Sequence, residues 1–252
     1  MLSSWKLLAP SLRPDATLQR DGWLSPRAGG GSMLALASEG LFEPINLIVS
    51  GQSDAFILTE EGFLDYARSI GFSFECLRQH RGGYQQANLG DGKGWENELF
   101  ELREVLVGAD PGDWIGTCVE SFTGGNHFRA WQQNGSAADT GAWFLAVSKE
   151  KSLRFSHTID HDGYNVGRDL MVGQALRPSC WAGRCWQASV EWANDLLAPG
   201  SDGINHGISQ DGRVAILFIE ETFDTRIGES KETPFAKPPR QRSGLVADRA
   251  RL

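Results

Sequence analysis

The sequence predicts an α+β domain in which a mainly antiparallel sheet of five or six strands carries helices packed on at least one face. Two observations predict it. Short runs of β-branched and other apolar residues, at 45–49 and 214–219, are bounded by turn residues, and only a few segments repeat their apolar residues at helical spacing. The 252 residues include 30 Gly and only 10 Pro, which indicates many turns between short elements.

Proline, glycine and charge mark the ends of this domain. Residues 1–40 contain three prolines and the run Gly29-Gly30-Gly31, which predicts an N-terminal arm that lies on the domain or is partly mobile. Residues 228–252 carry six Lys or Arg against three Asp or Glu, which predicts a basic, disordered tail. Residues 41–227 are then a single α+β domain.

The first elements follow from local signals. Residues 45–49 are expected to form a buried strand because the run is short and β-branched. A helix should follow, since Thr59 can cap its start and Gly71 can end it. The apolar residues of 95–106 recur at spacings of four, three and four, which predicts a second helix.

A tight hairpin is expected around Gly124-Gly125. This pair suits a two-residue turn with positive φ between residues 115–123 and residues 126–132. In that register Glu120 lies opposite Arg129 on one side of the ribbon.

The rest of the chain alternates in the same way. A second hairpin is expected to join residues 142–148 to residues 153–159. The polar turn at 160–165 then enters a helix that stops before Pro178, and apolar spacing over 186–197 predicts one more helix before the last strand.

Composition limits the partners and the compartment. A net charge of −8 and a pI near 5.2 argue against nucleic acid, whose binding needs clustered Lys and Arg. No run approaches the ~20 apolar residues of a membrane helix, so we expect no integral membrane segment. Without an evident signal peptide, we expect a soluble, cytoplasmic protein with four reduced, buried cysteines; a Cys180 to Cys185 disulfide is the alternative.

One polar cluster spans the end of the second expected hairpin, with the sequence His157-Thr158-Ile159-Asp160-His161-Asp162. Imidazole and carboxylate groups suit zinc, manganese or iron, which makes His127, His157 and Asp160 candidate metal ligands and leaves the identity of any cofactor open. The candidate catalytic residues are Asp160, His161 and Asp162. The alternative is that Asp160 or Asp162 caps a helix and that Arg168 pairs with a nearby carboxylate.

A second polar cluster lies on the strand Asn126-His127-Phe128-Arg129-Ala130-Trp131. His127 and Arg129 share a strand face, with Trp131 beside them as a stacking residue, so this face can bind an anionic group through a bidentate guanidinium. The alternative is an ion pair between Glu120 and Arg129 on a half-solvated sheet face.

Residues 44–176 resemble the LssY-like C-terminal domain family. The resemblance is carried, in the family's order, by Pro44-Ile45-Asn46-Leu47, by Asn126-His127-Phe128-Arg129-Ala130-Trp131, by Ala142-Trp143, by His157-Thr158-Ile159-Asp160 and by Gly167-Arg168-Asp169-Leu170. Such domains are often joined to membrane proteins with phosphatidic-acid-phosphatase-like and DedA-like parts, and they have no established activity. The resemblance thus implies a free-standing relative and carries over no catalytic residue.

These observations favour a binding or accessory domain for a small anionic ligand, such as one bearing a phosphate. The expected ligand-binding residues are Glu120, His127, Arg129, Trp131, Asn165 and Arg168. A metal-dependent hydrolase that uses the His and Asp cluster is the first alternative. The second is a purely structural domain whose polar groups satisfy one another.

Overall fold

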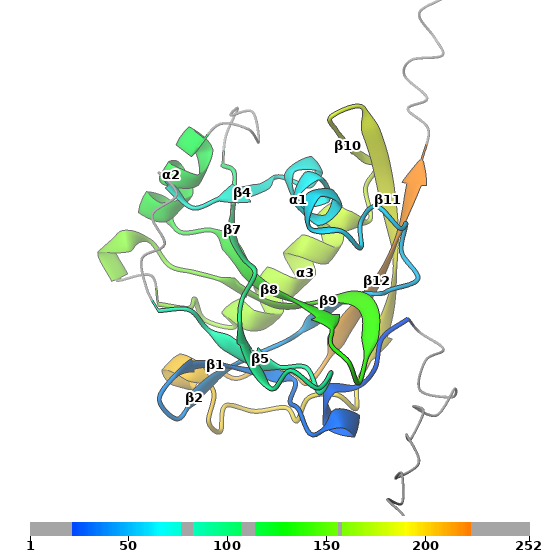
Figure 1. The fold of residues 1–252 in the computed structure, drawn as a ribbon. Coiled ribbons are helices and arrows are strands. Elements are labelled where there is room, and N and C mark those ends of the chain that lie inside the picture. The colour runs from blue at the N-terminus through cyan, green and yellow to red at the C-terminus, as the bar shows by residue number, and fades with distance from the viewer. Residues whose placement is uncertain (1–21, 77–82, 107–113, 156–157, 223–252) are drawn as a thin grey trace, which may run out of the picture.

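The computed structural model describes residues 22–76, 83–106, 114–155 and 158–222, which fold into three layers (Figure 1). Helices α1 (Glu60–Ser69) and α3 (Gly163–Ala175) cover one face of an eight-stranded sheet, and a four-stranded sheet packs on its other face. The expected α+β class is confirmed. The described residues form twelve strands, however, instead of five or six.

The large sheet has the strand order β10, β11, β12, β3, β9, β8, β7, β4. All neighbours are antiparallel except β12 and β3, which are parallel. The last described strand, β12, lies in the interior of the sheet between β11 and β3. In chain order the strands are β3 (Leu47–Val49), β4 (Phe72–Phe74), β7 (Phe100–Glu104), β8 (Asn126–Asn134), β9 (Asp139–Lys149), β10 (Ser179–Trp181), β11 (Arg184–Ala193) and β12 (Val214–Thr222).

The small sheet has the strand order β2, β1, β5, β6 and is antiparallel throughout. Its strands are β1 (Leu34–Ser38), β2 (Leu41–Pro44), β5 (Gln86–Asn88) and β6 (Trp95–Asn97). Strand β1 falls within the expected N-terminal arm, and the neighbouring Met33 is 1% exposed, so this part of residues 1–40 belongs to the folded core. Residues 1–21 and the expected tail at 228–252 lie outside the described residues.

Two apolar cores separate the three layers. Between the helices and the large sheet, Phe63 of α1 stacks on Trp143 of β9 with 4.3 Å between ring centroids. Between the two sheets, Trp131 and Phe144 pack with Met33 and with other apolar residues. Because both faces of the large sheet are buried, its strands β12, β3 and β9 are apolar on both sides over most of their length.

Local signals predicted helices α1 and α3 and strands β3 and β12 correctly. Helix α1 begins after Thr59, whose Oγ1 accepts a hydrogen bond of 3.1 Å from the Gly62 amide, and it ends just before Gly71, which has φ of 89°. Helix α3 and strand β12 also form where the sequence predicts a helix and a strand.

The helix expected at 95–106 is wrong, because these residues form β6 and β7. In β7, Leu102 packs into the helix-side core, whereas Glu101 and Arg103 point to the opposite face, where they meet carboxylates and guanidinium groups. Pairing of β7 with β4 and β8 imposes this two-residue period, and it overrides the helical spacing of the apolar residues.

The hairpin expected around Gly124-Gly125 is also wrong. Residues 114–123 form helix α2 (Trp114–Thr123), and Gly124, with φ of 81°, ends this helix by donating from its amide to the Glu120 carbonyl at 2.7 Å. Positive φ suits a helix end as well as a hairpin turn. Strand β8 pairs instead with β7 and β9, so Arg129 lies opposite Glu101 and Ala146, not opposite Glu120.

Two later expectations fail because of strand pairing at long range. Strand β9, expected to pair with residues 153–159, pairs with β8 and β3. Within residues 153–159, Leu153–Phe155 form a short 3-10 helix (η3), and residues 156 and 157 lie outside the described residues. Residues 186–197, expected as a helix, lie largely in β11, which pairs with β12 over nine residues. A continuous ladder of this length outweighs the local helical spacing.

The expectation of reduced cysteines is wrong. Cys180 and Cys185, directly opposite each other on β10 and β11, form one disulfide, and Cys76 and Cys118 form another between the end of β4 and α2. Disulfides persist in oxidising compartments, so the cysteines no longer support a cytoplasmic location.

Candidate functional site

The first sequence-predicted cluster lies where β7 and β8 pair near the edge of the large sheet. Arg129 is opposite Glu101, and His127 is opposite Arg103, so all four side chains share one face. Their strand neighbours Leu102 and Phe128 point the other way, into the helix-side core. The expectation that His127 and Arg129 share a face is thus confirmed, but their neighbours come from β7.

Arg129 is held by carboxylates of the protein itself. Its Nη1 donates to Glu98 Oε1 and its Nη2 donates to Glu101 Oε1 at 2.8 Å. Burial raises the pKa of Glu101 to about 7, since desolvation and the nearby Glu75 carboxylate outweigh the lowering by Arg129. The guanidinium of Arg129 therefore already has two acidic partners.

Arg103 links several elements in the same cluster. Its Nε lies 2.9 Å from Glu75 after β4, and its Nη1 lies 2.6 Å from Glu150 after β9 and 3.5 Å from the fully buried Glu120 of α2. Burial by itself lowers the pKa of Arg103, but the carboxylates of Glu150 and Glu120 raise it above its usual value. Glu120 therefore pairs with Arg103, whereas Arg129 pairs with Glu98 and Glu101.

His127 lies beside the same carboxylates. Its Nε2 is 3.5 Å from Glu150 Oε1, and its Nδ1 is 3.4 Å from Ser148 Oγ. Burial lowers the pKa of His127, although the Glu150 carboxylate opposes this, so the site favours the neutral imidazole. Trp131, on the next residue of this face, is 2% exposed and donates from Nε1 to the Glu96 carbonyl, so its ring packs in the core between the sheets.

The second predicted cluster surrounds the start of α3. Asp162 is the N-cap residue, with φ of 58°, and its Oδ1 accepts from Asn165 Nδ2 at 2.6 Å. Asp160 Oδ1 accepts from the amide of the exposed His161 at 2.8 Å. His157 lies outside the described residues, among which no group of three or more His, Cys, Asp or Glu side chains is arranged to hold a metal ion.

Arg168 and Asn165 hold the chain that leads into β12. Arg168 is 1% exposed and donates to both carboxylate oxygens of Asp211, at 2.7 and 2.9 Å, and to the Arg213 carbonyl at 2.8 Å. Asn165 Oδ1 accepts from the Asp211 amide at 3.1 Å. Burial alone raises the pKa of Asp211, but the hydrogen bond from Arg168 brings it below its usual value. These two predicted ligand residues therefore position a loop.

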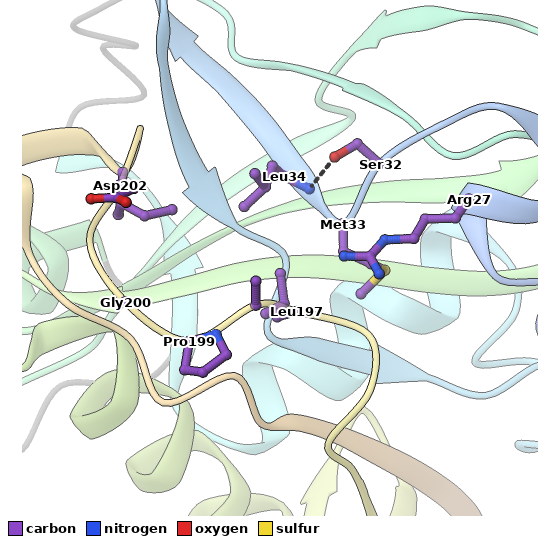
Figure 2. Close-up of a pocket in the computed structure, with 10 residues that line it drawn as sticks. Arg27, Ser32, Met33, Leu34, Leu197, Pro199, Gly200 and Asp202 are labelled. Carbon is purple, nitrogen blue, oxygen red and sulfur yellow. Dashed lines mark hydrogen bonds between the residues drawn. The ribbon is translucent and has the colours of Figure 1, made fainter.

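The segment that joins β11 to β12 forms one wall of a pocket that the sequence did not predict. The pocket has a volume of about 220 Å³ and lies between the start of the small sheet and the segment after β11 (Figure 2). Its lining residues are Arg27, Ser32, Met33, Leu34, Leu197, Ala198, Pro199, Gly200, Asp202 and Ile204. The pocket brings together residues from the expected arm and from a segment expected in part as a helix.

Backbone hydrogen bonds fix both walls. On one side, η1 (Pro26–Gly29) is closed by the Gly31 amide donating to the Pro26 carbonyl at 2.7 Å, and the Ser32 amide donates to Asn88 of β5. On the other side, Gly200 and Gln210 exchange two backbone hydrogen bonds of 2.9 and 3.1 Å. Both walls are consequently held without help from a ligand.

The pocket combines an apolar floor with charge at its rim. Met33, Leu197 and Ile204 are at most 5% exposed, and Leu34 packs against both apolar clusters that meet here. Figure 2 shows the Arg27 side chain reaching over Met33 into the pocket region. Arg27 is exposed and has no ion pair or side-chain hydrogen bond with another described residue.

Comparisons with protein-family models, with curated proteins and with solved structures find no match to this chain. The resemblance of residues 44–176 to the LssY-like family therefore stays a prediction. Among the described residues, no helix is long and apolar enough to cross a membrane.

Proposed function

We propose that this protein is a small-molecule-binding domain and that the pocket of Figure 2 holds a ligand with an anionic group at Arg27 and an apolar body over Met33 and Leu197. The observation that carries the proposal is a guanidinium without an acidic partner among the described residues, placed beside a buried apolar floor. Ligand sites commonly combine such a floor with a few polar groups that orient the ligand. Ser32, whose Oγ accepts from the Leu34 amide at 3.1 Å, still has a hydroxyl proton to donate.

The ligand class is the one that the sequence predicts, but the binding residues differ. Arg129 and Arg168 each have buried or partly buried carboxylate partners, so an external anion would compete with an internal ion pair. Arg27 offers its charge without this competition. We therefore assign the anion to Arg27 and assign structural roles to Arg129 and Arg168.

The pocket volume sets the size of the ligand. At about 30 Å³ for each water molecule in the liquid, 220 Å³ equals about seven waters, which corresponds to a ligand of roughly that many non-hydrogen atoms. A Kd of 1 mM corresponds to about −4.1 kcal/mol, or ~0.6 kcal/mol per atom, which is ordinary for small ligands. Hexanoate, a carboxylate on a short apolar chain, is a suitable probe.

The test is a titration of the oxidised full chain with hexanoate, followed by amide chemical shifts in NMR spectra. Arg27→Gln should weaken hexanoate binding about fivefold to thirtyfold, the range for losing a charged hydrogen bond at a partly exposed site. Arg177→Gln is the matched control, because it removes the same charge from an exposed position outside the pocket. Inorganic phosphate, which has no apolar part, should bind more weakly than hexanoate.

Two results would count against this proposal. The first is hexanoate binding that Arg27→Gln and Arg177→Gln weaken equally. The second is phosphate binding that depends on Arg129 or Arg168 in a variant that remains folded, which would return the site to the sequence-predicted residues. A metal-dependent hydrolase stays a prediction, tested by measuring the metal content of protein purified without an affinity tag.

A further inference from the structure

The pocket carries a carboxylate at the end opposite its guanidinium. Figure 2 shows Asp202 at one end and Arg27 at the other, with the apolar side chains of Leu34, Leu197 and Pro199 between them. Asp202 is exposed and, like Arg27, has no ion pair or side-chain hydrogen bond with another described residue. Figure 2 shows the two charged side chains at opposite ends of the pocket, and no ion pair joins them.

We propose that the ligand is a small zwitterion, with its acidic group at Arg27, its basic group at Asp202 and an apolar chain between them. This inference rests on the proposed function, because it uses the same pocket and the same contact with Arg27. A simple anion leaves Asp202 without a partner and is repelled by it. A ligand with a positive group at the far end turns that repulsion into attraction, which is how opposite charges at a binding site create specificity.

The backbone fixes the position of Asp202 relative to the small sheet. The Gly203 carbonyl accepts from the Phe42 amide of β2 at 3.0 Å, and Ile204 forms a parallel bridge with Phe42. Asn205 at the start of η4 (Asn205–Gly207) donates from Nδ2 to Glu43 Oε1 at 3.1 Å. Asp202 is thus preceded and followed by anchored chain, so the pocket selects ligands by the separation of their two charges.

Amino acids with the amine at the end of an apolar chain and short peptides share this chemistry. Titrations of the oxidised full chain with 6-aminohexanoate, hexanoate and hexylamine test the charge pattern, and alanylalanine tests whether a peptide is accepted. In the wild type, 6-aminohexanoate should bind about fivefold tighter than hexanoate, the factor that an exposed ion pair supplies at the upper end of its usual range. In a series of aminoalkanoates of increasing chain length, affinity should pass through a maximum at one length.

Substitution separates this inference from the proposed function. Asp202→Asn should abolish the preference for 6-aminohexanoate and leave hexanoate binding equal or tighter, whereas Asp195→Asn, an exposed residue outside the pocket lining, should keep the preference. Hexanoate binding that depends on Arg27 without any preference for the zwitterion overturns this inference and leaves the proposed function standing. Absence of binding by all four probes overturns both.

Discussion

Arg168→Met removes the guanidinium that joins α3 to the loop before β12, while keeping a long apolar side chain at a position that is 1% exposed. The variant loses two hydrogen bonds to Asp211 and one to the Arg213 carbonyl, and also the stacking on Trp192, whose ring centroid lies 5.1 Å from the guanidinium carbon. The exposed Asp169 carboxylate, which accepts from Arg168 Nε, adds little.

The size of the effect follows from burial. The Asp211 side chain is 34% exposed and can regain water, so its pair with Arg168 contributes near the lower end of the range for charged hydrogen bonds, ~1.5 kcal/mol. Loss of the hydrogen bond to the Arg213 carbonyl costs ~1 kcal/mol, and loss of the stacking on Trp192 costs ~0.5 kcal/mol. We expect the free energy of unfolding to fall by about 3 kcal/mol, which lowers Tm by about 6 to 12 °C in a domain of this size.

Chemical denaturation and thermal unfolding of the oxidised protein measure this change. Arg184→Met is the control, because Arg184 also stacks on an aromatic ring, that of Phe56, but its ion pair with Glu221 has both side chains more than 40% exposed; we expect a loss of ~1 kcal/mol. If Arg168→Met proves as mild as this control, Arg168 does not hold the loop, and the structural role assigned to it is wrong. The Asp211 pair should also weaken on acidification: because Arg168 lowers the pKa of Asp211 in the folded state, its contribution is present above pH ~4 and is lost as pH falls through the lowered pKa.

Three further predictions test other parts of the fold. Replacing both cysteines of the Cys76–Cys118 disulfide by serine should lower the free energy of unfolding by ~4 kcal/mol, against ~2 kcal/mol for the Cys180–Cys185 disulfide. The reason is that the first disulfide closes a loop with a sequence separation of 42 and the second a loop with a separation of 5. Equal losses in urea denaturation would contradict this. In α3, Gly167→Ala should lower Tm, since the added Cβ would lie 2.6 Å from the Ser148 carbonyl carbon. By contrast, the Cβ added by Gly173→Ala meets no atom within 4 Å, and this variant should stabilise the protein by up to ~1 kcal/mol. A lower Tm for both variants would refute the packing of α3 on β9. The Glu101 carboxyl should titrate near pH 7 in NMR spectra, and a midpoint below 5 excludes this. Its contribution should make stability fall as pH rises from about 4 to 7, because the folded protein keeps a proton that the unfolded chain has lost.

The sequence alone determined the elements whose signals are local. Thr59 and Gly71 mark the ends of α1 because a cap and a left-handed glycine act within a few residues of their own position. The apolar run before Ile219 predicted β12, since a strand buried on both faces has to be apolar throughout. The shared face of His127 and Arg129 also followed from the two-residue period of a strand.

Only the tertiary structure decided which strands pair and which charges meet. The apolar spacing at 95–106 is that of a helix, and the pairing of β7 with β4 and β8 overrides it. That pairing also gives Arg129 its partners Glu98 and Glu101 in place of Glu120. The pocket joins Arg27 to Leu197 and Asp202, which lie some 170 residues apart in sequence, and no local pattern encodes contacts at that range, because they arise when whole sheets and loops pack.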